Sequence, residues 1–300
     1  MQRVNGVNPR HLLPKMRRKD KNMTYREALE RAAALLSSSG VPEPEFDARE
    51  LLLHETGLDT SGLLLHREET FPEEKSSAYF RKIELRALRV PLQHILGEAW
   101  FYGRRFFVTP DVLIPRFDTE VLVSEVLKHE KASGGRTALD LCTGSGIIGI
   151  TLALEGGFDR VDASDISEKA LSIAKKNAEA LGAQMSFFCS DLFSEISGKY
   201  DVIVSNPPYI PAETISGLEP EVRDYDPENA LNGGADGLDF YRRIAGSAKE
   251  HFSPGGRLYL EIGDEEGEAV REILAGKGFH GIRIIRDFND KDRVVTCLTD

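Results

Sequence analysis

The chain has 300 residues, of which 41% are hydrophobic and 29% are charged. This composition is typical of globular proteins and excludes collagen-like, coiled-coil and wholly disordered classes. No apolar run approaches the roughly 18 residues that a membrane span needs, so we expect no membrane segment. The three cysteines form no CxxC pair. We therefore expect no disulfide framework, no metal site and a cytoplasmic location.

The net charge of −11 conceals an asymmetry along the chain. Residues 1–22 carry seven Lys and Arg against one Asp, which leaves −17 on residues 23–300. Because sequence-independent nucleic-acid binding depends on Lys and Arg contacts to phosphates, the acidic body argues against it. We interpret residues 1–22 as a basic, disordered leader. We favour a solvated extension, or an upstream start codon with Met23 as the native start, over an RNA-binding tail.

Helical patterns fill residues 23–97. Thr24 and Glu27 form a capping box, and apolar residues then recur at helical spacing up to a glycine. Further helices are expected at about 44–55 and 73–89. We therefore predict a small all-α domain over residues 23–97, and we expect it to bind a partner.

Residues 98–115 are rich in aromatic and β-branched side chains, which predicts a β-hairpin linking two domains. Strands and helices then alternate over residues 116–300. We expect strands at residues 137–142, 160–165, 184–189, 200–205 and 256–262. We expect helices at residues 118–130, 167–181, 237–250 and 265–277. Two last strands, at residues 281–287 and 293–298, are expected to form an antiparallel hairpin. This alternation predicts an α/β fold with a doubly wound, mostly parallel sheet.

Ligands of such sheets bind beyond the carboxyl ends of the strands. The first strand end carries a glycine-rich loop, where glycines let the backbone approach a ligand and the next helix offers free N–H groups. Its candidate cofactor-binding residues are Asp140, Cys142, Thr143, Gly144, Ser145 and Gly146. Residues 144–149 formally match GxGxxG, so a dinucleotide-binding loop is one interpretation.

Asp165 and Asp191 follow the next two strands. A carboxylate offers two acceptor oxygens to the adjacent hydroxyls of a ribose, which suits Asp165 to either NAD or S-adenosylmethionine. Asp191 is suited to accept from an adenine amino group while Leu192 covers the ring. Each aspartate alone is also compatible with a helix cap or a turn.

Asn206-Pro207-Pro208-Tyr209 directly follows the strand at 200–205. Two prolines and an aromatic residue at a strand end form a rigid wall. A flat amide or amino group can donate its two N–H groups to the Asn206 side-chain oxygen and the Pro207 carbonyl, with Tyr209 stacked on its face. Such a cradle aims a planar nitrogen at an electrophile and indicates methyl transfer.

In that order, DLCTGSG, SDIS, SDLF and VSNPPY resemble the class I S-adenosylmethionine-dependent methyltransferases that modify planar nitrogen. The closer resemblance, which also includes PLQHILGEAWFYGRRFFVTPDVLIPRFDTE, EPEVRDYDPENALNGGADGLDFYRRI and KDRVV, is to the release factor glutamine methyltransferases (PrmC/HemK). It covers the chain from residue 23 onward. Cys142 departs from a simple GxGxG pattern, because it stands where the first glycine is expected.

The resemblance implies methylation of the side-chain amide nitrogen, N5, of the glutamine in the Gly-Gly-Gln motif of peptide chain release factors. S-adenosyl-L-methionine is the implied cofactor and S-adenosyl-L-homocysteine the product. Cys142 to Gly146, Asp165, Asp191, Leu192 and Asn206 are implied to line the cofactor pocket, and residues 206–209 to hold the glutamine. The helical domain over residues 23–97 is implied to help bind the release factor.

Two other enzyme classes and a non-catalytic binding module are the alternatives. An adenine-N6 DNA or RNA methyltransferase could use the same cradle on a flipped base, but the acidic body counts against a nucleic-acid substrate. An NAD-dependent oxidoreductase would leave residues 206–209 unexplained, and no tyrosine begins a YxxxK pair. We expect direct in-line transfer without a metal, oriented by Asn206, Pro207 and Tyr209.

Overall fold

The computed structural model describes residues 22–130 and 135–300, and these form two compact units that divide between Leu96 and Gly97. The leader expected at residues 1–22 lies, except for its last residue, outside the described part. Among the described residues, no helix is both long and apolar enough to cross a membrane.

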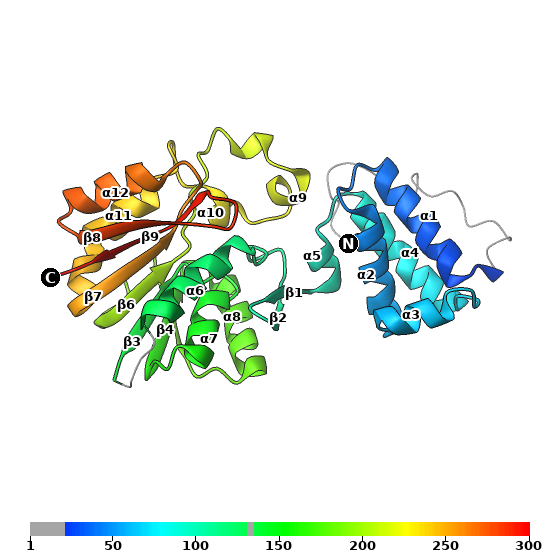
Figure 1. Ribbon diagram of the computed structural model, residues 1–300, viewed down its shortest axis with the longest axis horizontal. Helices are drawn as coiled ribbons and strands as arrows, with labels where there is room; N and C mark the ends of the chain where they lie inside the picture. The colour runs from blue at the N-terminus through cyan, green and yellow to red at the C-terminus, as the bar shows by residue number, and fades with distance from the viewer. Residues whose placement is uncertain (1–21, 131–134) are drawn as a thin grey trace. The chain divides into compact units, whose positions relative to one another are not determined.

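The first unit is all-helical (Figure 1). Its helices are α1 (Tyr25–Ser38), α2 (Pro44–Thr56), α3 (Thr60–His66), α4 (Glu73–Ala87) and α5 (Leu92–Leu96). The capping box is confirmed, because Thr24 Oγ1 accepts from the Glu27 N–H at 3.2 Å and Glu27 Oε2 accepts from the Thr24 N–H at 2.8 Å. One face of α1 packs with α2 and α4 around the buried Tyr79.

The second unit is built on a seven-stranded sheet of order β5-β4-β3-β6-β7-β9-β8. The strands are β3 (Thr137–Leu141), β4 (Arg160–Asp165), β5 (Ser186–Cys189), β6 (Tyr200–Ser205), β7 (Phe252–Glu261), β8 (His280–Arg286) and β9 (Asp292–Leu298). Neighbours from β5 to β7 pair in parallel, whereas β9 is antiparallel to both β7 and β8. The predicted mostly parallel sheet and its closing antiparallel hairpin are confirmed.

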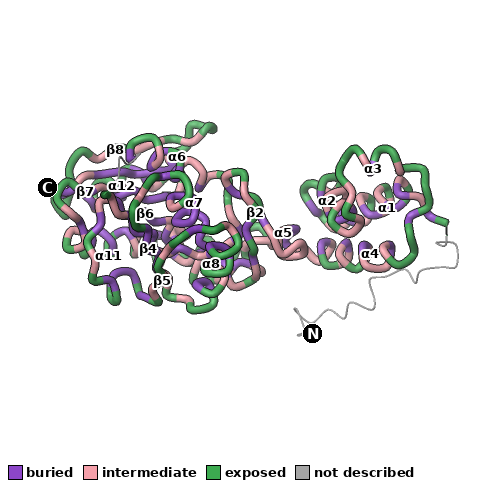
Figure 2. Tube along the Cα trace, turned by 90° about the horizontal axis from the view of Figure 1, so that it is seen from below, coloured by how far each residue is buried: buried purple, intermediate pink, exposed green. Residues whose placement is uncertain are grey.

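Helices cover both faces of this sheet (Figure 1). On one face lie α6 (Asp118–Glu130), α7 (Ile147–Glu155) and α8 (Glu168–Leu181), and on the other lie α11 (Asp239–Ser247) and α12 (Gly267–Gly276). Each face has its own apolar core. The central strands β3 and β6 are almost continuously buried, as expected for strands covered on both sides. Figure 2 shows buried backbone at β6 and exposed segments on the outside of the unit.

A β-hairpin begins the second unit, with β1 (Glu98–Phe101) paired to β2 (Arg104–Phe107). Its two-residue turn has positive φ at both Tyr102 (49°) and Gly103 (73°), which matches the right-handed twist of a hairpin. The buried Phe101 and Phe106 join the core beneath α6 and α7. The predicted hairpin is therefore present, and it is packed into the sheet-bearing unit.

Short helices occupy the segment after β6, where the sequence predicted no element. They are η3 (Ile215–Gly217), α9 (Pro220–Arg223) and α10 (Glu228–Leu231). Ile210 bridges to Asn232 by backbone hydrogen bonds, so the chain returns against the residues that follow β6. Gly237 is needed there, because it has a φ of 81° and a Cβ would lie 2.4 Å from the Tyr209 carbonyl oxygen.

Candidate active site

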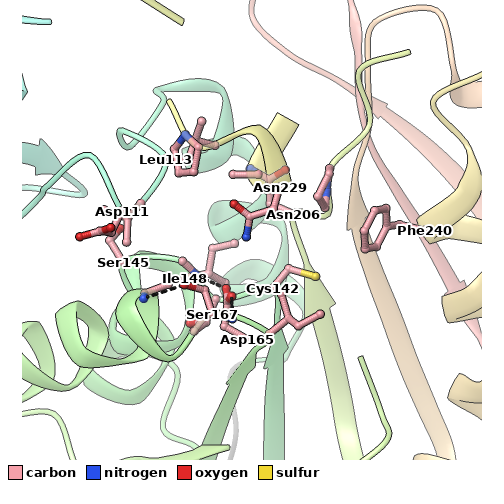
Figure 3. A pocket seen from close by; sticks show the side chains of 18 of the residues that line it. Asp111, Leu113, Cys142, Ser145, Ile148, Asp165, Ser167, Asn206, Asn229 and Phe240 are labelled. Carbon is pink, nitrogen blue, oxygen red and sulfur yellow. Dashed lines mark hydrogen bonds between the residues drawn. The ribbon is translucent and has the colours of Figure 1, made fainter. Parts of the chain in front are cut away.

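A cavity of about 650 Å³ lies at the carboxyl ends of the parallel strands (Figure 3). Four strand ends contribute to its wall, together with residues 111–119, residues 227–232 and α11. The predicted site residues that line it are Cys142, Thr143, Gly144, Ser145, Asp165, Asp191, Leu192, Asn206 and Pro208. The structure therefore brings together most of the residues singled out in the sequence.

The loop between β3 and α7 has the left-handed backbone that its glycines permit. Cys142, Gly144 and Gly146 have φ values of 59°, 55° and 86°. A Cβ on Gly144 would meet open space, whereas one on Gly146 would lie 2.8 Å from Ile150 Cδ1 and 3.1 Å from Ala174 Cβ. Gly144 therefore leaves room beside the cavity, and Gly146, which does not line it, allows close packing between α7 and α8.

Asp140 lies beneath this loop and does not line the cavity. Its Oδ2 accepts from Thr143 Oγ1 at 2.6 Å and from the Gly149 N–H at 2.8 Å. Complete burial raises the pKa of this carboxyl to about 7. As placed, Asp140 holds the loop in shape and reaches the cavity only through Thr143.

Cys142 lines the cavity as a neutral thiol. Burial and, to a smaller extent, the nearby Asp165 carboxylate together raise its pKa to about 12. A thiolate nucleophile is therefore disfavoured at this position. The side chain supplies a small apolar surface between β3 and β6.

Asp165 is held by backbone N–H groups on both of its oxygens. Oδ2 accepts from Gly144 at 2.9 Å and Oδ1 accepts from Ser167 at 2.9 Å. Each carboxylate oxygen retains a further lone pair, and the side chain points toward the cavity (Figure 3). The carboxylate is thus oriented in advance for two adjacent hydroxyl donors.

Asp191 and Leu192 form the wall at the end of β5. Asp191 Oδ1 accepts from Arg243 Nη2 at 2.7 Å, which leaves its second oxygen for another donor. Leu192 is buried and has a φ of 52°. Phe240, beside Arg243 on α11, also lines the cavity. Together they make a largely apolar slot with one acidic edge, which suits a purine ring.

Asn206 and Pro208 line the cavity just after β6. Figure 3 shows the Asn206 side chain in the middle of the labelled lining residues. Pro207 is buried, and Tyr209 packs against the core beside α11 instead of lining the cavity. Burial raises the pKa of the Tyr209 hydroxyl, which is therefore neutral. The stacking expected for Tyr209 thus remains a prediction, whereas the exposure of Asn206 to the cavity is a property of the structure.

Several lining residues were not singled out in the sequence. Arg116 Nη2 donates to Asp226 Oδ2 at 2.8 Å, and this ion pair joins the segment before α6 to the segment after β6. Thr119 accepts from Asn206 Nδ2 at 3.3 Å. These contacts bridge about a hundred residues of chain, so local patterns did not reveal them.

The cavity fits a nucleoside. The oriented Asp165 carboxylate suits ribose hydroxyls, the slot at Leu192 suits a flat base, and open space beside Gly144 admits a ligand close to the backbone. Among the described residues, no group of three or more His, Cys, Asp or Glu could hold a metal ion.

Two family models match the chain. Residues 27–97 match the PrmC N-terminal domain, and residues 116–216 match the methyltransferase small domain. The first match covers the helical unit, and the second covers the strand ends from β3 to β6.

Curated relatives match almost the whole chain. A release factor glutamine methyltransferase of Cereibacter sphaeroides is 41% identical over 277 residues, which cover 92% of this chain and 98% of the relative. The Bacillus subtilis enzyme of the same name is 39% identical over 284 residues, with 92% and 98% covered.

Solved structures support the fold. A methyltransferase from Pyrococcus furiosus is 18% identical, with a TM-score of 0.51 and coverage of 76% of this chain and 98% of that one. A T. thermophilus 16S rRNA methyltransferase in complex with AdoMet and guanosine is also 18% identical, with a TM-score of 0.51 over 68% and 50% of the two chains. The protein has the class I methyltransferase fold, it is an S-adenosylmethionine-dependent enzyme, and the chain belongs to the release factor glutamine methyltransferase family.

Proposed function

We propose that this enzyme methylates the side-chain amide nitrogen of the glutamine in the Gly-Gly-Gln motif of peptide chain release factors. The observation that carries the proposal is the position of Asn206. Its amide group lies in the same cavity wall as Asp165 and Leu192, so a planar nitrogen bound by Asn206 lies within reach of the cofactor pocket. Family membership and the net charge of −17 on residues 23–300 favour a protein substrate.

When bound, S-adenosylmethionine supplies an electrophilic methyl group. The chain's own residues bind and orient. Asp165 is proposed to hold the ribose hydroxyls, Asp191 and Leu192 the base, and residues 142–146 the rest of the cofactor. Thus the protein contributes position and electrostatics, which suffice where the reacting group is already activated.

On the substrate side, Asn206 Oδ1 and the Pro207 carbonyl are proposed to accept the two amide N–H groups of the glutamine. Pro207 and Pro208 fix the backbone at this strand end, so the acceptors keep a constant separation. Hydrogen bonds to both N–H groups would hold the amide plane, so that one face of the glutamine nitrogen is presented to the methyl group. The nitrogen would gain the methyl carbon as that carbon's bond to sulfur breaks, with S-adenosylhomocysteine as the leaving group, and the surplus N–H proton would then pass to solvent.

The helical unit is proposed to bind the release factor. It has its own core, and its surface exposes Leu64 (65% exposed) and Leu65 (81% exposed) on α3. Every proposed cofactor contact belongs to the other unit. The separate cores are therefore consistent with one unit that binds the release factor and another that binds the cofactor. We place the reaction in the cytoplasm, where release factors act on ribosomes.

Purified enzyme with methyl-labelled S-adenosylmethionine tests this proposal directly. Release factor and adenine-containing duplex DNA would be offered in parallel at equal concentration. We expect label in the release factor and none above background in DNA. Label in DNA alone would support the adenine-N6 alternative and overturn the proposal.

A further inference from the structure

Glu261 is a buried acid behind the cavity wall, next to the lining residues Asn206 and Thr119. It ends β7, and its neighbour Leu260 pairs with Ser205 of β6, so Glu261 lies beside Asn206. The residue is 1% exposed, and its Oε2 has no hydrogen-bond partner among the described residues. Such a carboxyl is costly to bury without a role or a compensating contact.

Two donors connect Glu261 to the proposed substrate cradle. Asn206 Nδ2 donates to Thr119 Oγ1 at 3.3 Å, and the side chains of Asn206 and Thr119 both lie close enough to the Glu261 carboxyl to lower its pKa. Thr119 is 1% exposed and lies in the first turn of α6. The nitrogen of Asn206 therefore faces a buried acceptor group, and its oxygen is left for the cavity.

We propose that Glu261, directly and through Thr119, is a positioning residue that fixes the Asn206 amide with Nδ2 toward the protein and Oδ1 toward the substrate. This inference rests on the proposed function for the identity of the substrate. An ionised carboxylate can only accept hydrogen bonds. Rotating the amide by 180° would place Oδ1 against it, so the flipped state is disfavoured.

The charges around Glu261 make the orientation of the Asn206 amide sensitive to pH. The pKa of its carboxyl is raised to about 7, chiefly by burial and also by the Asp118 carboxylate on α6, while Thr119, Arg293 on β9 and Asn206 oppose this shift. Tyr209 and the Tyr241 hydroxyl, which donates to the Glu261 backbone oxygen at 3.0 Å, are the other titratable neighbours, and both are neutral. A protonated Glu261 can donate to Asn206 Oδ1, which removes the preference for one orientation.

The first test is the pH dependence of kcat for the Glu261→Gln variant. In the wild type, kcat should rise with pH and level off above about 7, as Glu261 ionises. The kcat of the variant should not rise in this way, and at pH 8 it should be about tenfold lower than that of the wild type. A loss of this size is expected when one hydrogen bond no longer favours a single orientation of the Asn206 amide. KM for S-adenosylmethionine should change less than twofold, since Glu261 does not line the cavity.

Glu130→Gln is the matched control. Glu130 is another buried glutamate on α6, 3% exposed, but it pairs with Arg136 and Arg257 at the opposite end of the helix from Thr119. This variant should lose stability and keep the wild-type pH profile. Thr119→Ser should retain activity, because it keeps the hydroxyl, whereas Thr119→Val should resemble Glu261→Gln.

The second test does not require turnover. The side-chain NH2 resonances of Asn206, identified by their loss in Asn206→Ala, should shift with pH in the wild type with a midpoint near 7 and stay constant in Glu261→Gln. Constant resonances in both proteins, or an unchanged pH profile in active Glu261→Gln, would contradict the positioning role. If the wild type fails to methylate release factor but its Asn206 resonances titrate as described, the proposed function is wrong and the positioning role of Glu261 is retained.

Discussion

Asn206 lines the cavity, and we propose that it contacts both the cofactor and the substrate glutamine. It lies in the wall shared with Asp165, and its nitrogen donates to Thr119. The sequence predicted its place at a strand end, because an asparagine followed by two prolines is distinctive. Thr119 and Glu261 could not be recognised in the same way, since their contact with Asn206 depends on how α6 and β7 pack around β6.

Removing the Asn206 side chain should impair chemistry more than binding. We expect Asn206→Ala to lower kcat by about 10² or more, as for other preorganised polar contacts to a transition state. The affinity for S-adenosylmethionine should change far less. Single-turnover rates and calorimetric titration would separate the two effects, and equal losses in both would place Asn206 on the cofactor alone.

Asn206→Asp gives a sharper result because of its neighbour Glu261. An aspartate still accepts from the substrate amide, but it places a second carboxyl beside Glu261, and two adjacent carboxylates resist ionising together. Activity should therefore exceed that of Asn206→Ala near pH 6.5, where the pair shares a proton, and approach it near pH 8.5. Rates measured at these two pH values would contradict this if both variants were equal throughout.

At the scale of elements, the sequence predicted the parts with strong periodicity. The capped α1, the five parallel strands and the closing hairpin were expected near their observed bounds. Helix α3 was missed because it has only seven residues, and two of its three leucines face solvent. β7 begins at Phe252 instead of 256, since the Pro and Gly residues at its start hide a register shift against β6.

The cavity lining also consists of one part that sequence patterns predicted and one part that they did not. Strand ends of a doubly wound sheet were sufficient to predict most of the lining from residue 142 to residue 208. The remaining wall comes from residues 111–119, residues 227–232 and α11. Their place depends on long-range contacts such as the Arg116–Asp226 ion pair, which no local pattern encodes.

The loop between β3 and α7 gives a paired prediction, because two of its glycines serve different purposes. Gly144→Ala adds a methyl group in open space beside the cavity, so it should weaken S-adenosylmethionine binding with a modest loss of stability. Gly146→Ala crowds Ile150 and Ala174 and should lower the free energy of unfolding by about 1–3 kcal/mol. Thermal melts and cofactor titration of both variants would check this contrast, and the same loss pattern in both would contradict it.

At the scale of the whole molecule, the two units have separate cores. The buried clusters of residues 97–300 include no residue of the helical unit, and the reverse also holds. A chain of residues 97–300 should therefore fold and bind S-adenosylmethionine with close to full affinity. Its kcat/KM on release factor should fall strongly. Full catalytic efficiency in this shortened chain would exclude a binding role for the helical unit.

The buried Glu261 should also make stability depend on pH. Its carboxyl keeps its proton up to about pH 7 in the folded protein but ionises near 4.5 when unfolded. Between these values the folded state binds more protons, so the stability supplied by the neutral acid is present below pH 4.5 and is lost as pH rises through 7. Denaturation of wild type and Glu261→Gln should show the variant gaining stability relative to wild type from pH 5 to pH 8, and a constant difference would contradict this.

The location of the transferred methyl group shows whether the motif glutamine is the residue that the enzyme modifies. Labelled release factor would be digested and the modified residue identified by mass spectrometry, with Gly-Gly-Ala and Gly-Gly-Asn forms of the motif as controls. We predict label on the motif glutamine alone and none on either control, because the asparagine nitrogen falls more than about an ångström short and such misplacement can cost about 10² in rate. Label on any other residue, or undiminished label in the Gly-Gly-Ala form, would contradict the account.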